Sequence, residues 1–411
     1  MRVLCPAHAG VLICLVSLLF ALRPSLPVHA SGGQVLELRH TERLEPHETE
    51  KIVGELFGDR PAPEARYDID AYIMRYTSYY PNEGRPNGGT PNEDVAYEDV
   101  AGITAQLFVP RRDDPSPLYL FAPGTTGLVD ACRPSREHIV GIHWGLYRAH
   151  VLAFVSKGFI GLLPDYTGFG EPGRLQPVFH ARTEAKMMLD GVRAVAEATA
   201  GELSPALASE HVFLAGFSQG GHAAFAAADY REEYAPDVEI AGVVGYGPTT
   251  DIPTLFREFP VVAPMVIKMF GELYGTDRFP AEAMLQERWQ EDLEHHVTRQ
   301  CIGSMQSFYP WNARELFREE FAEALFADRL EEEFPEIYRI MRRNSPGLTG
   351  HGVPTFILQG ADDIVISSQS QERFVSALRA AGSEVQYEFY EDARHDTRQV
   401  GFPDVLEWIG R

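Results

Sequence analysis

The feature that most constrains this chain is Gly216-Phe217-Ser218-Gln219-Gly220, a G-x-S-x-G pattern inside the stretch LAGFSQGGH. An apolar, strand-like run at 212–215 precedes it, and a run of small residues typical of a helix, 223–228, follows it. Where a strand turns this sharply into a helix, the positions two before and two after the serine have no room for side chains. The pattern therefore predicts a nucleophile elbow with Ser218 at its tip. The alternative is an ordinary turn of small residues that contains a serine.

A serine hydroxyl is a weak nucleophile until a histidine accepts its proton and an acid orients that histidine. In sheets with an elbow of this type, the acid and the histidine follow the serine in that order along the chain. Two apolar, strand-like runs, 355–358 and 385–390, lie downstream of the serine. His395 comes shortly after the second run, and no other histidine lies between residues 352 and 411, so His395 is the candidate base.

Two adjacent acids follow the first of these runs, in the segment Gly360-Ala361-Asp362-Asp363. Neighbouring side chains point in different directions, so we expect one of them to orient His395. The spacing from Gly360 and the apolar residues 364–366 that follow select Asp363, with Asp362 as the alternative. For either residue, the competing interpretation is a solvated carboxylate in a turn.

The negative oxygen of a tetrahedral intermediate needs two backbone N–H donors. One comes from the residue after the nucleophile, which here is Gln219. The other comes from a loop after an earlier strand, and the glycine-containing loop 121–127 is such a loop. Thr125 is the candidate donor and Thr126 is the alternative; the competing interpretation is an ordinary glycine-rich turn.

Short apolar runs alternate with helical patterns from about residue 118 onward, which predicts an α/β fold with a mostly parallel sheet and helices on both faces. Ahead of this region, we expect a helix at 47–57, strands at 67–80 and 103–109, and a surface loop at 81–92. Within it, the expected strands are 118–121, 159–163, 212–215, 240–244, 355–358 and 385–390, and the expected helices are 138–157, 181–200, 369–381 and 404–409.

One long gap interrupts this alternation, because no strand pattern occurs between residues 246 and 353. Compact domains rarely leave so long a segment without secondary structure, and this one is helical, acidic and aromatic. We therefore predict a helical cap at 247–350, inserted into a core formed by 31–246 and 351–411. Its acidic runs are most simply solvated helix faces, and its most apolar stretch, 261–270, either lines an acyl site or forms the core of the cap.

The first 30 residues have the composition of a secretory signal peptide. Arg2 is followed by the apolar run 11–22, no acidic residue occurs, and Val28-His29-Ala30 is a suitable cleavage site. The alternative is a membrane anchor, but the apolar run is shorter than the ~20 residues that a spanning helix needs. We expect export and cleavage near Ala30, without stable membrane insertion.

Cleavage at this point would remove Cys5 and Cys14 and leave Cys132 and Cys301. Two cysteines in an oxidising compartment predict one disulfide, with two free buried thiols as the alternative. The net charge of −23 argues against nucleic acid and anionic membrane surfaces as partners.

Several other polar residues are less suited to catalysis. His222 directly follows the elbow and is interpreted as a packed structural histidine, and Asp165 and Tyr166 as structural hydrogen-bonding residues beside the site. The pair His295 and His296 lacks the spacing of a zinc motif, and His138 and His143 have no partner carboxylate at ligand spacing. We expect no metal and no cofactor.

With these motifs in order, the chain resembles the α/β-hydrolases of the secretory lipase family. The resemblance covers most of residues 67–411 and rests on the segments 72–78, 123–127, 132–135, 164–170 and 216–221 and on the pair Asp363 and His395. Many members have a histidine before the oxyanion glycine, whereas Pro123 stands there in this chain, which puts the geometry of the oxyanion hole in question. The resemblance implies a cap that supplies an acyl-binding tunnel and a disulfide from the Cys132 position to that cap.

These features together indicate an exported serine hydrolase that cleaves small-molecule or lipid esters, a lipase or carboxylesterase. An amide hydrolase or an acyltransferase would use the same triad, and a non-catalytic binding protein could keep the same fold.

Overall fold

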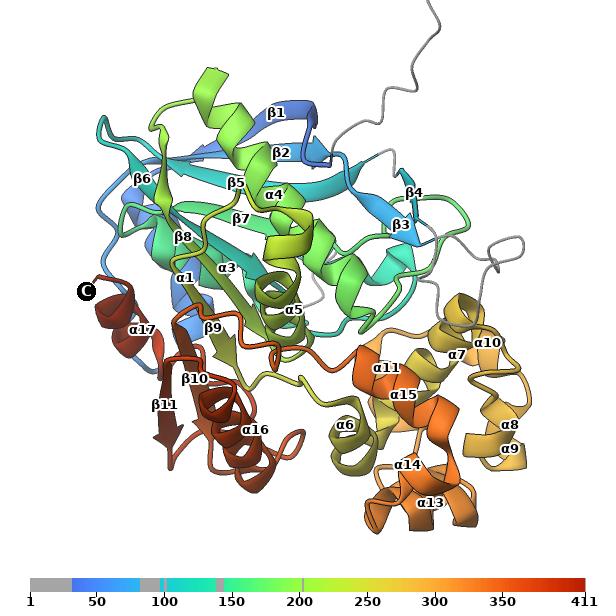
Figure 1. Ribbon diagram of the computed structural model, residues 1–411. Helices are drawn as coiled ribbons and strands as arrows, with labels where there is room; N and C mark the ends of the chain where they lie inside the picture. Colours follow the sequence, from blue (N-terminus) through green and yellow to red (C-terminus); the bar gives the residue numbers. More distant parts are fainter. Residues whose placement is uncertain (1–31, 82–96, 100–101, 138–143, 202, 411) are drawn as a thin grey trace, which may run out of the picture. The chain divides into compact units, whose positions relative to one another are not determined.

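The computed structural model describes residues 32–81, 97–99, 102–137, 144–201 and 203–410 (Figure 1). The predicted signal peptide at 1–30, with Cys5 and Cys14, lies outside these residues. So does most of the predicted surface loop at 81–92. Within the part of the chain that is described, no helix is long and apolar enough to cross a membrane.

A nine-stranded mixed sheet forms the centre of the fold, in the order β1-β2-β5-β7-β6-β8-β9-β10-β11. From β7 to β11 all neighbouring strands pair in parallel, as the sequence predicts. Every residue of β7, β9 and β10 is buried, because helices cover both faces of this part of the sheet. These strands are β6 (Ser116–Ala122), β7 (Ile160–Pro164), β8 (Leu207–Phe217), β9 (Gly242–Tyr246), β10 (Thr355–Gly360) and β11 (Val385–Tyr390).

The other edge of the sheet is antiparallel and consists of β1 (Val35–Leu44), β2 (Ile69–Tyr76) and β5 (Ile103–Pro110), the last of which pairs with β7. The single strand expected at 67–80 is in fact two. Beyond β2, the short strand β3 (Tyr79–Pro81) leaves the main sheet and pairs with β4 (Tyr97–Asp99) in a separate ribbon.

Two hydrophobic clusters lie on the two faces of the sheet, one on each face. One holds apolar side chains of α4, α5 and α16, and the other holds those of α1, α3 and α17. The helices themselves can be followed in Figure 1. The helices are α1 (Pro46–Phe57), α3 (Tyr147–Val155), α4 (Ala181–Gly201), α5 (Gln219–Tyr234), α16 (Ser368–Ala380) and α17 (Phe402–Ile409); two short 3-10 turns, η1 (Asp130–Cys132) and η2 (Pro134–Arg136), follow β6.

Of the helix expected at 138–157, the described residues contain α3, and residues 138–143 lie outside them. Leu146 has a left-handed backbone with φ of 51°, which an α-helix cannot continue through, so α3 starts at Tyr147. The carboxylate of Glu137 accepts hydrogen bonds from the backbone N–H groups of Gly145, Leu146 and Tyr147 at 2.7 to 3.0 Å. A side chain upstream therefore satisfies the amides at the start of this helix.

Helices alone occupy the chain between β9 and β10, and we call this segment, 247–354, the helical insertion. Its hydrophobic core includes nearly all of the apolar stretch 261–270. It consists of α6 (Ile252–Glu258), η3 (Pro260–Val262), α7 (Ala263–Tyr274), α8 (Ala281–Met284), α9 (Glu287–Gln290), α10 (Leu293–Val297), α11 (Ile302–Phe308), α12 (Ala313–Leu316), α13 (Glu319–Phe326), α14 (Leu330–Glu333) and α15 (Pro335–Arg343).

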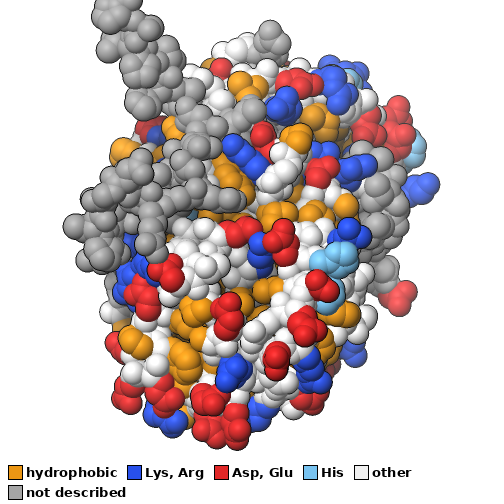
Figure 2. All heavy atoms as spheres, turned by 90° about the vertical axis from the view of Figure 1, so that its right-hand side faces the viewer, with side chains coloured by type: hydrophobic (Ala, Val, Ile, Leu, Met, Phe, Trp, Pro, Cys, Tyr) orange, Lys and Arg blue, Asp and Glu red, His pale blue; other side chains and the backbone are white. Residues whose placement is uncertain are grey.

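The acidic runs of the helical insertion are exposed, as at Glu319, Glu320 and the residues 331–333. Figure 2 looks onto the side of the molecule on the right of Figure 1, and acidic and basic side chains are interspersed there with hydrophobic ones. This agrees with the interpretation of these runs as solvated helix faces.

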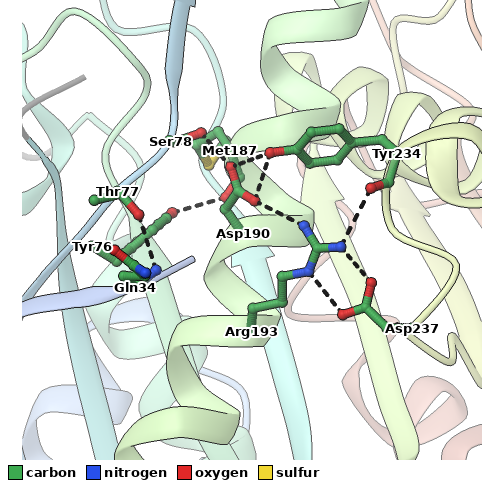
Figure 3. Close-up of polar contacts among 9 residues, drawn as sticks. All are labelled: Gln34, Tyr76, Thr77, Ser78, Met187, Asp190, Arg193, Tyr234 and Asp237. Atoms are coloured by element: carbon green, nitrogen blue, oxygen red, sulfur yellow. Dashed lines mark hydrogen bonds and ion pairs between the residues drawn. The ribbon is translucent and has the colours of Figure 1, made fainter. Parts of the chain in front are cut away.

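A buried polar cluster on the α4–α5 side of the sheet joins α4 to α5 and to the end of β2 (Figure 3). Asp190 on α4 accepts hydrogen bonds from Ser78 Oγ at 2.8 Å and from the Tyr234 hydroxyl at 2.8 Å. Burial raises the pKa of Asp190 to about 6, although these hydrogen bonds and the nearby Arg193 oppose the shift. Arg193 itself binds Asp237, so the cluster extends to the loop after α5.

Candidate active site

Ser218 stands on the turn between β8 and α5 in a strained backbone conformation, with φ of 54° and ψ of −116°. Non-glycine residues rarely adopt positive φ, and such strain concentrates at functional sites. The flanking glycines have a steric reason: an added Cβ at Gly216 would lie 2.0 Å from the Gly220 backbone, and one at Gly220 would lie 1.9 Å from the Ala122 carbonyl oxygen. The local sequence thus folds as the elbow pattern requires, with Ser218 half-buried.

The structure brings Asp363 and His395 together at the ends of β10 and β11. The His395 Nδ1 and Asp363 Oδ2 atoms are 2.8 Å apart. The other carboxylate oxygen of Asp363 accepts hydrogen bonds from the backbone N–H groups of Val365 and Ile366 at 2.7 and 3.0 Å. Asp362, the alternative acid, is exposed and makes no side-chain contact with His395.

The second ring nitrogen of His395, Nε2, is buried and has no hydrogen-bond partner among the described residues. The ring packs at 4.9 Å from the ring of Phe217, which directly precedes Ser218. Gly247, with φ of +51°, passes beside the same imidazole, where an added Cβ would lie 3.0 Å from Nδ1. His395 is therefore held between the elbow and the loop after β9, with one nitrogen bonded and one available.

The loop after β6 lies beside the elbow because β6 and β8 pair in parallel, with Ala122 opposite Gly216. Gln219 is the first residue of α5, where a helix leaves its backbone N–H groups without intrahelical partners. Thr125 is half-buried, and its neighbour Thr126 is buried with its carbonyl bonded to the Ile302 amide at 2.8 Å. The candidate oxyanion donors thus come from adjacent loops.

Asp165 and Tyr166 make the supporting contacts that the sequence suggests for them. The Tyr166 hydroxyl donates to the Pro123 carbonyl at 2.6 Å, beside the oxyanion loop. The Asp165 carboxylate accepts from the Ser135 amide and hydroxyl at 2.8 and 2.6 Å. Burial raises the pKa of Asp165 to about 7, while the bonds from Ser135 and the charge of Arg133 oppose this shift.

Sequence reasoning did not identify the ion pair between the buried Arg398 and the half-buried Asp396, which follows directly after His395. The guanidinium donates to both carboxylate oxygens of Asp396, at 2.9 and 2.6 Å, and to the Gly145 carbonyl. It lies 4.8 Å from the centre of the Phe217 ring, which it shares with the imidazole of His395. The only sign of this pair in the sequence is the polar segment HDTR at 395–398, which is equally typical of an exposed loop.

Sequence reasoning also missed Glu184, the partner of His222. His222 is fully buried, and its Nδ1 lies 2.6 Å from Glu184 Oε2. Its Nε2 lies 2.8 Å from the backbone oxygen of Asn344, so both ring nitrogens are engaged. This agrees with a packed structural role for His222. The sequence signal that could have identified this pair is a glutamate, Glu184, on the apolar face of the helix predicted at 181–200.

Other histidines lie away from the elbow or outside the described residues. His295 and His296 belong to α10 in the helical insertion, while His138 and His143 fall in the segment that is not described. Among the described residues, no group of three or more His, Cys, Asp or Glu side chains could hold a metal ion.

Cys132 and Cys301 form a disulfide with an S–S distance of 2.12 Å, in agreement with the expected pairing. Cys132 ends η1 in the loop after β6, and Cys301 directly precedes α11. An isolated β-bridge between Gly127 and Cys301 lies beside the disulfide. The loop after β6, which holds the candidate oxyanion donor Thr125, is thus attached to the helical insertion by a disulfide and by backbone contacts.

Sequence comparisons relate the chain to a family and to a relative. A family model described as secretory lipase matches residues 136–411. A relative from Mycobacterium tuberculosis (strain CDC 1551 / Oshkosh), named probable inactive lipase MT1628, is 24% identical over an alignment of 270 residues that covers 63% of this chain. The match covers 56% of that protein, so this chain spans little more than half of its length.

Two solved structures share the fold at low sequence identity. The rice cell wall degrading esterase LipA from Xanthomonas oryzae matches with a TM-score of 0.69 and 16% identity, covering 92% of this chain and 96% of that one. Candida antarctica lipase A in its closed state matches with a TM-score of 0.64 and 19% identity, covering 92% and 82%. With the mixed sheet covered on both faces, this likeness confirms the predicted α/β-hydrolase fold class.

Proposed function

The chain belongs to the secretory lipase family, and on that premise we propose that it is an exported serine hydrolase that cleaves carboxylic esters through an acyl-enzyme. One observation carries the proposal. His395 Nδ1 lies 2.8 Å from Asp363 Oδ2, and its Nε2 has no hydrogen-bond partner among the described residues, beside an elbow whose serine has positive φ. A neutral imidazole that donates Nδ1–H to a carboxylate carries its lone pair on Nε2, ready to accept the proton of a hydroxyl nucleophile.

In the proposed reaction, Ser218 Oγ attacks the ester carbonyl carbon while His395 Nε2 takes its proton. Asp363 holds the imidazole in its tautomer and stabilises the imidazolium that forms. The oxygen that becomes negative accepts hydrogen bonds from the backbone N–H groups of Gln219 and Thr125. His395 then protonates the leaving alcohol, and a water that it deprotonates releases the acid and regenerates Ser218.

We further propose that residues 247–350 of the helical insertion, the boundaries expected from the sequence, act as a cap over this site. Its core cluster includes Val365 and Ile366, the two residues whose backbone N–H groups bind Asp363. The packing of the insertion and the position of the acid are therefore linked. Export is supported by the family and by the disulfide Cys132–Cys301.

The proposal is tested by assaying the mature protein on p-nitrophenyl esters of short and long acyl chains, beside Ser218→Ala. Ser304→Ala, at an exposed serine of α11, is the matched control and should leave the rate unchanged. Release of p-nitrophenol that depends on Ser218 is the expected result. A short-chain preference would assign an esterase, and a long-chain preference a lipase.

A second candidate is a non-catalytic member of the same fold, because one relative is named a probable inactive lipase. Absence of Ser218-dependent cleavage of any ester, in a protein shown to be folded, would overturn the hydrolase proposal in favour of this candidate. Cleavage of a p-nitroanilide, or acyl transfer to an added alcohol in preference to water, would instead assign the amide hydrolase or acyltransferase alternative.

A further inference from the structure

A second histidine–carboxylate pair lies on the other side of the elbow, at the junction of α4, α5 and the end of α15. Glu184, His222 and Asn344 are 2%, 0% and 1% exposed. His222 Nδ1 lies 2.6 Å from Glu184 Oε2, and His222 Nε2 lies 2.8 Å from the main-chain oxygen of Asn344. Neither contact takes part in the reaction proposed for Ser218.

The chemistry of the two acceptors decides where the protons are. A backbone carbonyl only accepts, so Nε2 must carry a proton and donate it to Asn344. An ionised carboxylate also only accepts, so Nδ1 must carry a second proton and donate it to Glu184. We infer that His222 is doubly protonated and, with ionised Glu184, forms a buried ion pair that positions the start of α5 and the end of α15 relative to each other.

The surroundings favour the charged form of Glu184 over a protonated one. Its Oε1 accepts two further hydrogen bonds, from Gln219 Nε2 at 2.7 Å and from the Phe179 amide at 3.0 Å. Three donors directed at one carboxylate stabilise its negative charge. Glu184 also lies in the first turn of α4, where the helix dipole favours an anion.

The cation is equally well placed at the other end of the pair. Asn344 is the C-cap of α15, so its carbonyl is one of the terminal acceptors that a helix cannot satisfy itself. A positive charge at a helix C-terminus is favoured by the dipole. His180 lies beside His222 and is in turn near the basic groups Arg182, Lys186 and Arg343, while Tyr166 lies near Glu184 and Tyr274 binds Asn344. Glu184 is the carboxylate that hydrogen-bonds to His222.

The pair joins the helical insertion to the site, which gives it a positioning role that rests on the proposed function. The Asn344 side chain donates to the Tyr274 hydroxyl of α7 at 2.9 Å and accepts from the Ala181 amide of α4 at 3.1 Å. Glu184 meanwhile holds the Gln219 side chain, and the backbone N–H of Gln219 is a proposed oxyanion donor. Movement of α15 is thereby coupled to the oxyanion hole through His222.

The protonation state is measured directly by 15N NMR of the folded protein with labelled histidine, at neutral pH. The His222 signals are identified as those missing from the spectrum of His222→Gln. Both ring nitrogens should show the shift and the attached proton of an imidazolium. An unprotonated Nδ1 or Nε2 at His222 would overturn the ion pair. This readout does not need activity, so its failure and the failure of the proposed hydrolase are separate results.

Glu184→Gln gives the matched neutral variant. The carboxamide can donate to Nδ1 while its oxygen still accepts from Gln219 and Phe179, so every contact can persist with a neutral His222. We expect Nδ1 to lose its proton in this variant while Nε2 keeps one and the protein stays folded. A His222 that keeps both protons in the Glu184→Gln variant would contradict the pairing with Glu184.

The positioning role is tested by kinetics on the ester that the wild-type protein cleaves. His222→Gln should lower kcat roughly 10- to 100-fold, as expected for losing a hydrogen bond to a buried charge, with little change in KM. Glu184→Gln should retain most of kcat, and His211→Gln, at an exposed histidine of β8, should retain all of it. A kcat for His222→Gln equal to that of His211→Gln, or a loss confined to KM, would overturn the role.

Discussion

Two histidine–carboxylate pairs flank Ser218, and they differ in what the second ring nitrogen meets. In the pair at the ends of β10 and β11, His395 binds Asp363 through Nδ1, and its Nε2 has no partner among the described residues. In the pair between α4 and α5, His222 binds Glu184 through Nδ1, and its Nε2 is taken by the Asn344 carbonyl. One ring nitrogen of His395 is therefore free of hydrogen bonds within the described residues, whereas both ring nitrogens of His222 are engaged.

On the proposed function, the histidine nearest to Ser218 in the sequence, His222, is not the general base, and the more distant His395 is. His222 is four residues from Ser218 in the sequence, and its contact to a carboxylate is the shorter of the two. A general base needs a free lone pair within reach of the proton that it abstracts. Both ring nitrogens of His222 have hydrogen-bond partners, which suits a structural role.

The largest effect is expected from removing the acid of the first pair. Asp363→Asn keeps the shape of the side chain but can donate to Nδ1, which would place the proton of His395 on Nε2, the wrong tautomer. We expect kcat to fall roughly 10³- to 10⁴-fold, as for the same change in other Ser-His-Asp triads. Steady-state rates on the best p-nitrophenyl ester measure this, with Asp362→Asn as the adjacent control. A similar loss in both variants would refute the choice of Asp363.

For the pair of His222 and Glu184, we expect removal of the carboxylate to lower the free energy of unfolding. Glu184→Ala leaves the buried donors of His222, Gln219 and Phe179 without their acceptor, and a buried polar group left unsatisfied costs about 1–3 kcal/mol. Glu184→Gln keeps these contacts, so urea denaturation of the two variants should show the difference in free energy of unfolding. Equal stabilities of the two variants would mean that the contacts of Glu184 do not hold this joint together, and the contrast between the two pairs would then lose its basis.

A smaller effect is expected at the covalent tie between the oxyanion loop and the helical insertion. The disulfide joins residues 169 positions apart, and closing a loop of this size contributes typically about 2–4 kcal/mol. Cys132→Ser with Cys301→Ser should lower the free energy of unfolding by about this amount in urea titrations. Thiol counting on the unreduced, denatured mature protein should find no free thiol, and two titratable thiols would contradict the bridge.

The smallest effect is expected on the pH dependence of stability and comes from His180, a buried histidine near His222. Burial, followed by the nearby charges of Arg182, Arg343 and His222, lowers the pKa of His180 from 6.5 to about 3. A lowered histidine pKa means that the stability is fully present above the unfolded value and is lost as the pH falls from 6.5 toward 3. Between about pH 7 and pH 5 this loss amounts to about 2 kcal/mol.

His180→Gln removes this titration, so its stability deficit relative to the wild-type protein should shrink by the same amount over that interval. Urea midpoints at the two pH values measure the change. A deficit that stays constant with pH would mean that His180 binds a proton equally well in the folded and unfolded states, and the contrast with His222 would then not hold.

The sequence by itself determined the elements whose causes are local. The elbow follows from small residues on either side of Ser218, and the parallel half of the sheet follows from short apolar runs between helices. The positions of Asp363 and His395 follow from the order of strands in such a sheet. The cysteine count reduced the disulfide to one possible pair. Each of these inferences depends on residues within one element or on the order of elements.

Only the tertiary structure decided which side chains meet across elements. It placed Glu184 against His222 from 38 residues away and the Asn344 carbonyl from 122 residues away. It also buried Arg398 beside Asp396 and placed the start of α3 directly after Leu146. Such contacts arise from the packing of α4, α5 and the helical insertion, and they leave no periodicity or spacing in the chain. The role of an imidazole depends on what its two nitrogens meet, and a one-dimensional pattern does not contain that information.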